Sequence, residues 1–376
     1  MAPHQLEVFC YEVDSNCEDL TRYKRYGLHP ILLGDLLPKL GSCVSEPSKK
    51  PRYHIAQKIG VGSFSTVWLA RDIEQERYVA LKACDGTEKP LESNEVRVLK
   101  TLQHKGQGKP GSSNIIQLYD TFTIEGPNGY HEILITEVVI PFHSISSSKG
   151  SSRAVRQLME GFSSLHEEGI FHGVSRLTVF DVDPHYGNFG IAVPQLQQFD
   201  ESEIVDFFSN PEIEPVVPID PHFQRDSLPA YVVQGIDIES FLKDKKTMPP
   251  KETWVYKILD LGRAYLANEP IQKLPGCCPS YIRPPEIFMH LITNGKIGPA
   301  WSKEADIWAI GCLFAKIMDI FLLAYGGSLE SRLYNALDVG GPPPEEWAGF
   351  WDLEEYRQKR MEEGRDNLPA LDRKKA

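Results

Sequence analysis

Lys82 stands in an apolar run, Val79-Ala-Leu-Lys82, where an ammonium group is costly unless it meets anions. Before it, Gly60-Val-Gly62-Ser-Phe-Ser65-Thr-Val67 places glycines between two strand-like runs, so that a turn of backbone can close over phosphates. Glu95 follows on a segment with helical apolar spacing and is placed to face back toward Lys82. Together these residues predict a site for nucleotide phosphates, whereas Lys82 alone could also be an edge-strand lysine that reaches solvent.

Two later segments carry oxygen donors that suit phosphoryl transfer. Asp183 and Asn188 stand five residues apart, so the carboxylate can accept a hydroxyl proton while the amide reaches a metal from the same loop. Asp260 ends the apolar run Lys257-Ile-Leu-Asp260 and precedes Leu-Gly262, and such hard oxygen ligands suit Mg²⁺. We therefore predict that Asn188 and Asp260 hold Mg²⁺, although Asp-Leu-Gly alone could be an ordinary turn.

The elements that must position these side chains change character along the chain. Short β-branched and aromatic runs predict an antiparallel meander, and a Ser/Gly-rich linker at 144–153 separates them from helical spacing. We expect an α+β fold, with a small antiparallel β-rich N-lobe that contains one helix and a larger, mainly helical C-lobe. The expected strands are 53–60, 65–72, 78–84, 115–124 and 132–140, and the expected helices are 90–103, 154–169 and 307–325.

Composition narrows the class of protein. The 376 residues carry a formal net charge of −12, which argues against direct nucleic-acid binding and favours basic partners. Seven cysteines without a CxxC pair predict a reducing, intracellular compartment, cytoplasmic or nuclear. The apolar run 307–325 contains Lys316 and Asp319, so we expect a buried helix rather than a membrane span.

In order and spacing these motifs resemble the set of the eukaryotic protein kinases, with Pro284-Pro285-Glu286 and Asp306-Ile-Trp-Ala-Ile-Gly311 as later members. The likeness runs from about Tyr53 to Trp347. Within that family the chain looks most like fungal SR-protein kinases, because of the leader EDLTRYKRYGLHPILLGD, the turn GVGSFSTVWLARD and the phrase GGPPPEEW. The resemblance implies a bilobal, ATP- and Mg²⁺-dependent serine/threonine kinase that acts on Arg/Ser-rich splicing factors. We expect a monomer without a membrane partner.

The resemblance also implies a role for each site residue. Lys82 and Glu95 would form an ion pair, Asp183 would be the catalytic base, and Asn188 and Asp260 would ligate Mg²⁺. Thr136 would be the gatekeeper and Glu137–Val139 the hinge that meets adenine. The nucleotide pocket would comprise Ile59, Gly60, Val61, Gly62, Ser63, Phe64, Ser65, Val67, Ala80, Lys82, Thr136, Glu137 and Val139.

The same likeness divides the chain. Residues 1–52 are expected to be a leader, 53–139 the N-lobe, 140–365 the C-lobe and 366–376 a charged tail. Residues 193–251, Pro- and acid-rich without periodicity, are interpreted as a spacer inserted at the surface of the C-lobe. We expect the last helices of the family's C-lobe to be missing, because the segment MEEGRDNLPALDRKKA does not match them.

One departure opens a second interpretation. Residues Val174–Val182 separate Gly173 from Asp183, and without them the sequence would read His-Gly-Asp-Pro-His-Tyr-Gly-Asn. The stretch is either an insertion from a retained intron or a real loop that displaces Asp183, and a small displacement of a catalytic group can cost about 10²-fold in rate. The alternatives are an active kinase, a catalytically impaired relative that binds nucleotide or acts as a scaffold, and a small-molecule kinase of the aminoglycoside or choline type.

Overall fold

The computed structural model describes residues 8–9, 17–62, 64–105, 108–141, 152–172, 188–208, 213–218, 225–267, 283–297, 303–317, 328–341, 343–349, 358 and 361–362. The chain divides into two compact units. Unit 1 comprises Met1–Ser146 and Tyr186–Gly262, and unit 2 comprises Ser147–His185 and Arg263–Ala376. The units divide the chain differently from the expected lobes, and the lobe boundaries stay a prediction.

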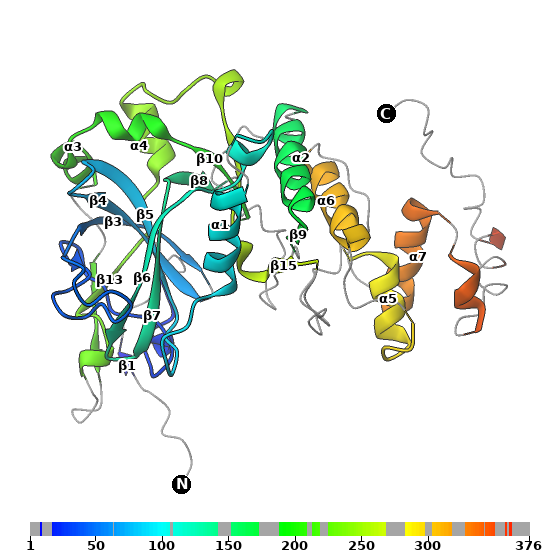
Figure 1. Cartoon of the computed structure of the whole chain (residues 1–376), viewed down its shortest axis with the longest axis horizontal. Helices are drawn as coiled ribbons and strands as arrows, with labels where there is room; N and C mark the ends of the chain where they lie inside the picture. Colours follow the sequence, from blue (N-terminus) through cyan, green and yellow to red (C-terminus); the bar gives the residue numbers. More distant parts are fainter. Residues whose placement is uncertain are drawn as a thin grey trace, which may run out of the picture. The chain divides into compact units, whose positions relative to one another are not determined.

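Unit 1 is built on a six-stranded antiparallel sheet (Figure 1). The expected meander is confirmed, since the runs at 53–60, 65–72 and 78–84 form three consecutive strands, and the two later runs meet at the tight turn between Gly126 and Gly129. Helix α1, Asn94–Lys105, packs against β6, and the Gln103 side chain donates to the Leu118 carbonyl. In sheet order the strands are β2 (Leu36–Leu37), β3 (Tyr53–Gly62), β4 (Ser65–Asp72), β5 (Arg77–Cys84), β7 (Gly129–Thr136) and β6 (Leu118–Gly126).

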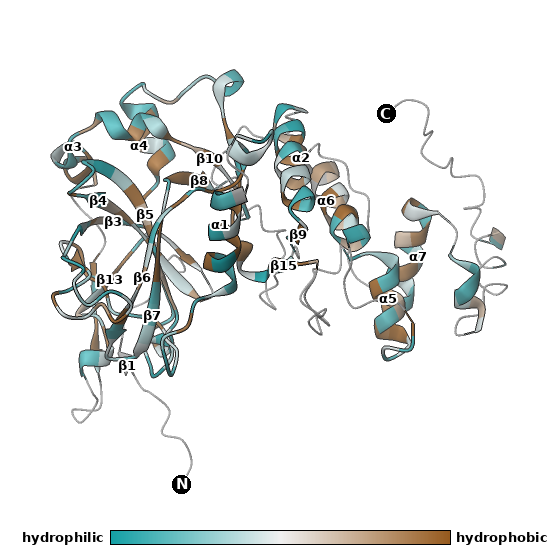
Figure 2. Ribbon diagram, viewed as in Figure 1, coloured by the Kyte–Doolittle hydropathy of each residue, from teal (hydrophilic) through white to brown (hydrophobic). Residues whose placement is uncertain are grey.

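One face of this sheet is covered by the leader. Val79, Leu81 and Ala83 alternate along β5 and are buried in a core that contains leader residues and Val233. Because side chains alternate between faces of a strand, Ala80 and Lys82 lie on the opposite face. The apolar stretches of the strands stand out in brown (Figure 2). The leader residues of this core are Ile31, Leu37 and Cys43.

Residues 188–262 belong to unit 1, and most of the expected spacer packs there. Its helices α3 (Glu201–Phe207) and α4 (Ile238–Asp244) bring Phe207 and Phe241 together, with ring centroids 5.2 Å apart. Each helix has seven residues, about two turns, which is too short to show a helical period in the sequence. The strands of this part are β8 (Val139–Pro141), β10 (Phe189–Ala192) and β14 (Tyr256–Ile258) in one sheet, β11 (Ile213–Pro215) with β13 (Tyr231–Val233), and β1 (Val8–Phe9) with β12 (Val217–Pro218).

Unit 2 is mainly helical in the part that the structure describes. Helix α2 packs against α6, and α5 packs against α7. No helix among the described residues is long and apolar enough to cross a bilayer, and residues 318–325 of the expected 307–325 helix lie outside the described ranges. The elements are α2 (Ser152–Glu167), β9 (Ile170–Phe171), β15 (Tyr265–Leu266), α5 (Pro285–Ile292), α6 (Lys303–Ile317) and α7 (Leu329–Gly340). The expected α+β class, an antiparallel β-rich part followed by a helical part, is confirmed.

Candidate active site

The predicted pair of Lys82 and Glu95 is formed. The Lys82 ammonium on β5 donates to Glu95 Oε2 on α1 over 2.6 Å, and the two side chains are 24% and 10% exposed. Burial alone would lower the pKa of Lys82, but the nearby carboxylates of Glu95 and Asp260 outweigh it and raise the pKa above its usual value. Lys82 is therefore a fixed cation on the face of the sheet opposite the leader.

Asp260 joins this pair from the segment after β14. Its Oδ1 lies 3.8 Å from Lys82 Nζ, and its side chain is 38% exposed, so the carboxylate reaches both the lysine and solvent. Its φ of 54° is uncommon for a residue with a side chain, although aspartate tolerates it better than most. A Cβ at Gly262 would stand 3.4 Å from Asp260 Oδ1 and 3.9 Å from Glu95 Oε2, so the backbone at this glycine lies next to both carboxylates.

Asn188 lies at the same end of the β10–β14 pair as Asp260. Phe189 is opposite Ile258 in the register, and the Leu259 amide donates to the Asn188 carbonyl over 2.8 Å. The two predicted metal ligands thus lie just outside a shared antiparallel ladder, Asn188 before β10 and Asp260 after β14. Amide and carboxylate oxygens at neighbouring positions fit the hard-ligand chemistry of Mg²⁺.

Sheet register gathers the predicted nucleotide-pocket residues on one face. Lys82 is opposite Val67, and Val67 is opposite Gly60 on the next strand. Two residues along β5, Ala80 is opposite Thr136. Paired residues and residues two apart share a face of a sheet, so these five positions form one continuous surface.

The predicted hinge residues follow directly from β7. The Thr136 hydroxyl donates to the Glu137 carbonyl over 3.2 Å, and Val139 begins β8, opposite Ala192. Glu137 Oε1 accepts from the Lys257 ammonium over 2.7 Å, and both side chains are nearly buried. The hinge is thereby tied to β14, the strand that leads to Asp260.

Lys257 was not among the site residues predicted from the sequence. The signal was present, because Lys257 is a lysine in an apolar strand, as Lys82 is. In both positions a buried ammonium is costly unless it meets a carboxylate.

The glycine turn joins β3 and β4. Gly62 is opposite Ser65, whose side chain is buried, and a Cβ at Gly62 would stand 3.1 Å from Ser65 Oγ. Val61 and Phe64 at the turn are 41% and 57% exposed. Ile59 lies at the irregularity between Lys58 and Gly60, and Ser63 lies outside the described residues.

Comparison with known proteins places these motifs in a family. The protein kinase domain model matches residues 53–173. The chain is 32% identical over 171 residues to the serine/threonine-protein kinase spk-1 of Caenorhabditis elegans, which covers 42% of this chain and 16% of that protein. It is 34% identical over 140 residues to SRSF protein kinase 3 of Sus scrofa, with 37% and 23% covered, and 34% identical over 131 residues to the serine/threonine-protein kinase SKY1 of Saccharomyces cerevisiae, with 34% and 16% covered.

In this region the chain is similar to eukaryotic protein kinases of the SRSF protein kinase, spk-1 and SKY1 type. The matches span only 16% to 23% of the length of these relatives. The expected bilobal kinase class is confirmed by the family match and by the antiparallel sheet and helical parts. Lys82, Glu95 and the hinge lie inside the matched range 53–173, whereas Asn188 and Asp260 lie beyond it.

In unit 2, Asp306 organises the segment before the predicted catalytic loop. Its fully buried carboxylate accepts from the His172 backbone amide over 3.0 Å and from His166 Nε2 over 2.8 Å. His172 is therefore held in place at the entry to the loop. The predicted base Asp183 and the stretch Val174–Val182 lie outside the described residues.

Proposed function

We propose that this protein is a serine/threonine protein kinase that transfers the γ-phosphate of ATP to protein serines. The observation that carries the proposal is the arrangement of Lys82 with Glu95 at 2.6 Å and Asp260 at 3.8 Å, on the face of the sheet opposite the leader. A fixed cation and a solvent-reaching carboxylate are what a magnesium nucleotide requires from a protein.

Each residue has a separate task in this proposal. Lys82 binds phosphate oxygens, and Glu95 keeps its ammonium pointed toward them. Asn188 and Asp260 would hold Mg²⁺, which supplies positive charge to the phosphate oxygens when it is bound. The serine oxygen attacks the γ-phosphorus, the bond to the ADP oxygen breaks, and the serine proton passes to the Asp183 carboxylate.

The proposed substrates are Arg/Ser-rich proteins. The net charge of −12 favours cationic peptides, and SRSF protein kinase 3 is named for a substrate class of this kind. We further propose that the protein acts as a monomer in the cytoplasm or the nucleus, where such splicing factors would meet it.

A second candidate is a kinase-like protein that binds nucleotide without transferring phosphate. The observation that favours it is the stretch Val174–Val182 between Gly173 and Asp183. If the stretch is part of the mature protein, His172 and Asp183 are separated by ten residues rather than one. The ion pair of Lys82 would then serve binding alone.

Transfer of labelled γ-phosphate to an Arg-Ser repeat peptide distinguishes the two candidates. The full chain, a version lacking Val174–Val182 and Asp183→Asn are compared, with an Ala-Arg repeat peptide as the acceptor control. The kinase proposal predicts label on the Arg-Ser peptide from the full chain or the shortened version, and none from Asp183→Asn. ATP binding without label from either version would establish the binding candidate instead.

A further inference from the structure

The turn that the proposed function assigns to the nucleotide phosphates is held from outside by the leader. Arg22 Nη1 donates to the Gly62 carbonyl over 2.7 Å, and Nη2 of the same guanidinium donates to Asp85 Oδ1 over 3.1 Å. The Asp85 backbone amide in turn donates to the Phe64 carbonyl over 2.8 Å. Arg22 and Asp85 thus hold the carbonyls on both sides of residue 63.

This contact does not belong to a loose segment. Arg22 ends a short 3₁₀ turn, Leu20–Arg22, and the next residue, Tyr23, is buried against Leu228 and Val232. The Tyr23 hydroxyl donates to Glu18 over 2.6 Å. Glu18 also accepts from the ammonium of Lys58 on β3, and both charged side chains are 1% exposed.

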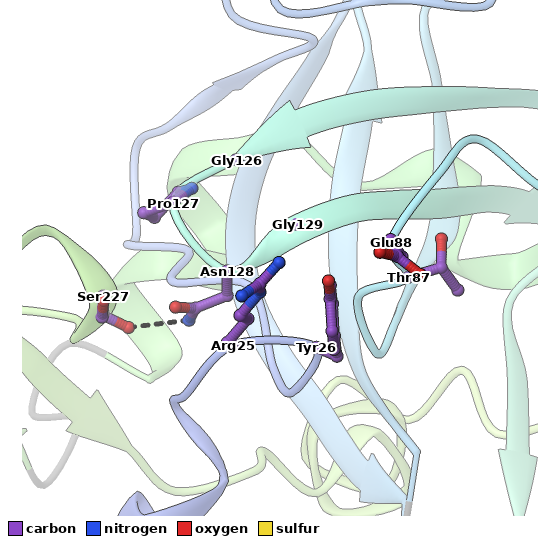
Figure 3. Close-up of a pocket in the computed structure, with 9 residues that line it drawn as sticks. All are labelled: Arg25, Tyr26, Thr87, Glu88, Gly126, Pro127, Asn128, Gly129 and Ser227. Atoms are coloured by element: carbon purple, nitrogen blue, oxygen red, sulfur yellow. Dashed lines mark hydrogen bonds between the residues drawn. The ribbon is translucent and has the colours of Figure 1, made fainter.

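The leader is fixed again four residues later, at the β6–β7 turn (Figure 3). The Tyr26 amide donates to the Asn128 carbonyl over 2.7 Å. The Asn128 side-chain amide donates to the Leu28 carbonyl over 2.7 Å and to the Ser227 carbonyl over 2.9 Å. A small pocket here is lined by Arg25 and Tyr26, and none of the predicted site residues lines it.

Arg22 is therefore the point at which the leader contacts the glycine turn. A guanidinium presents several donors in a fixed plane. It can therefore bind a carbonyl and a carboxylate at once, and the second hydrogen bond costs little additional side-chain entropy. Arg22 lies before residue 53, outside the range that matches the kinase domain model, whereas its partners Gly62 and Asp85 lie inside that range.

We propose that Arg22 is a positioning residue for the nucleotide, through which the leader holds the glycine turn in the conformation that receives phosphates. The proposal rests on the proposed function, because it presumes that the turn binds ATP. Arg22 does not touch the reacting atoms, so its removal affects occupancy of the turn conformation and leaves the chemical step unchanged.

The test compares Arg22→Ala and Arg22→Lys in the full chain, with Arg25→Ala as matched control. Arg25 is an exposed arginine of the same leader whose guanidinium lies 4.8 Å from the centre of the Tyr26 ring. A partly exposed charged hydrogen bond predicts that Arg22→Ala weakens Mg·ATP binding about fivefold. We expect the KM of this variant for ATP to rise by the same factor, while its kcat stays within about twofold of the wild-type value. Arg22→Lys should recover part of the ATP affinity.

Amide hydrogen exchange of the nucleotide-free chain supplies a readout that does not depend on ATP. Exchange over residues 60–67 is expected to accelerate in Arg22→Ala and not in Arg25→Ala, while exchange over β6 and β7 stays at the wild-type rate. Unchanged exchange and unchanged ATP affinity in Arg22→Ala would overturn the proposal, as would equal effects of the two alanine variants. If the wild type does not bind ATP, the proposed function fails, and the nucleotide role of Arg22 fails with it. The exchange comparison then still decides whether Arg22 holds the turn.

Discussion

His29 is expected to make the stability of unit 1 depend on pH. The ring is 6% exposed, stands 4.7 Å from the ring of His131, and its Nδ1 has no hydrogen-bond partner among the described residues. Burial, and then the charges of His131 and Lys39, lower the pKa of His29 from 6.5 to about 3. The folded chain therefore keeps this imidazole neutral while the unfolded chain protonates it, and stability is lost as the pH falls below 6.5.

The magnitude follows from that shift. One pKa unit corresponds to about 1.4 kcal/mol, so His29 should remove about 2 kcal/mol of folding free energy between pH 7 and pH 5. Urea unfolding at several pH values measures it, with wild type compared with His29→Gln and with His104→Gln, an exposed histidine, as control. His29→Gln should have a flatter acid limb by about that amount, and His104→Gln should follow the wild type. If the free energy of unfolding falls with pH in the same way for the wild type and His29→Gln, His29 is not the source of the pH dependence.

Two further predictions concern stability. Glu95→Gln removes one side of the site's ion pair and should cost about 1–2 kcal/mol by urea unfolding. Glu92→Gln, which removes one side of an exposed pair with Lys100, should cost less than about 0.5 kcal/mol. Equal costs would show that the Glu95 pair contributes no more than a surface pair. A Cβ at Gly340 would stand 2.7 Å from Trp308 Cζ3, while one at Gly349 would have no atom within 4 Å. Gly340→Ala should therefore lower the free energy of unfolding by about 1–3 kcal/mol. Thermal unfolding of Gly340→Ala and Gly349→Ala measures the difference. Equal melting temperatures of the two variants would contradict the close approach of Gly340 to the Trp308 ring.

The strands and the ion pair could be predicted because their signals are local. β4, Ser65–Asp72, has the predicted bounds, because a run of β-branched and aromatic residues is bounded by turn residues on either side. Lys82 and Glu95 are thirteen residues apart, with one strand end and one helix start between them. Such a short connection leaves few arrangements for the two side chains.

The remainder depended on contacts between distant parts of the chain. Arg22 meets Gly62 across forty residues, and Glu137, between β7 and β8, meets Lys257 on β14. Nothing in the local pattern of the leader indicates which carbonyl its arginine will reach. The 193–251 stretch shows the same limit, because α3 and α4 are too short for a period and are stabilised by packing with each other.

Titration with ATP, with and without Mg²⁺, tests whether Lys82, Glu95 and Asp260 form a magnesium nucleotide site in this chain. We expect Mg²⁺ to strengthen ATP binding by the wild type. Asp260→Asn should lose most of this magnesium effect, while Asp244→Asn, on α4, should retain it. The same ATP affinity with and without Mg²⁺ in the wild type would show that these residues form no such site.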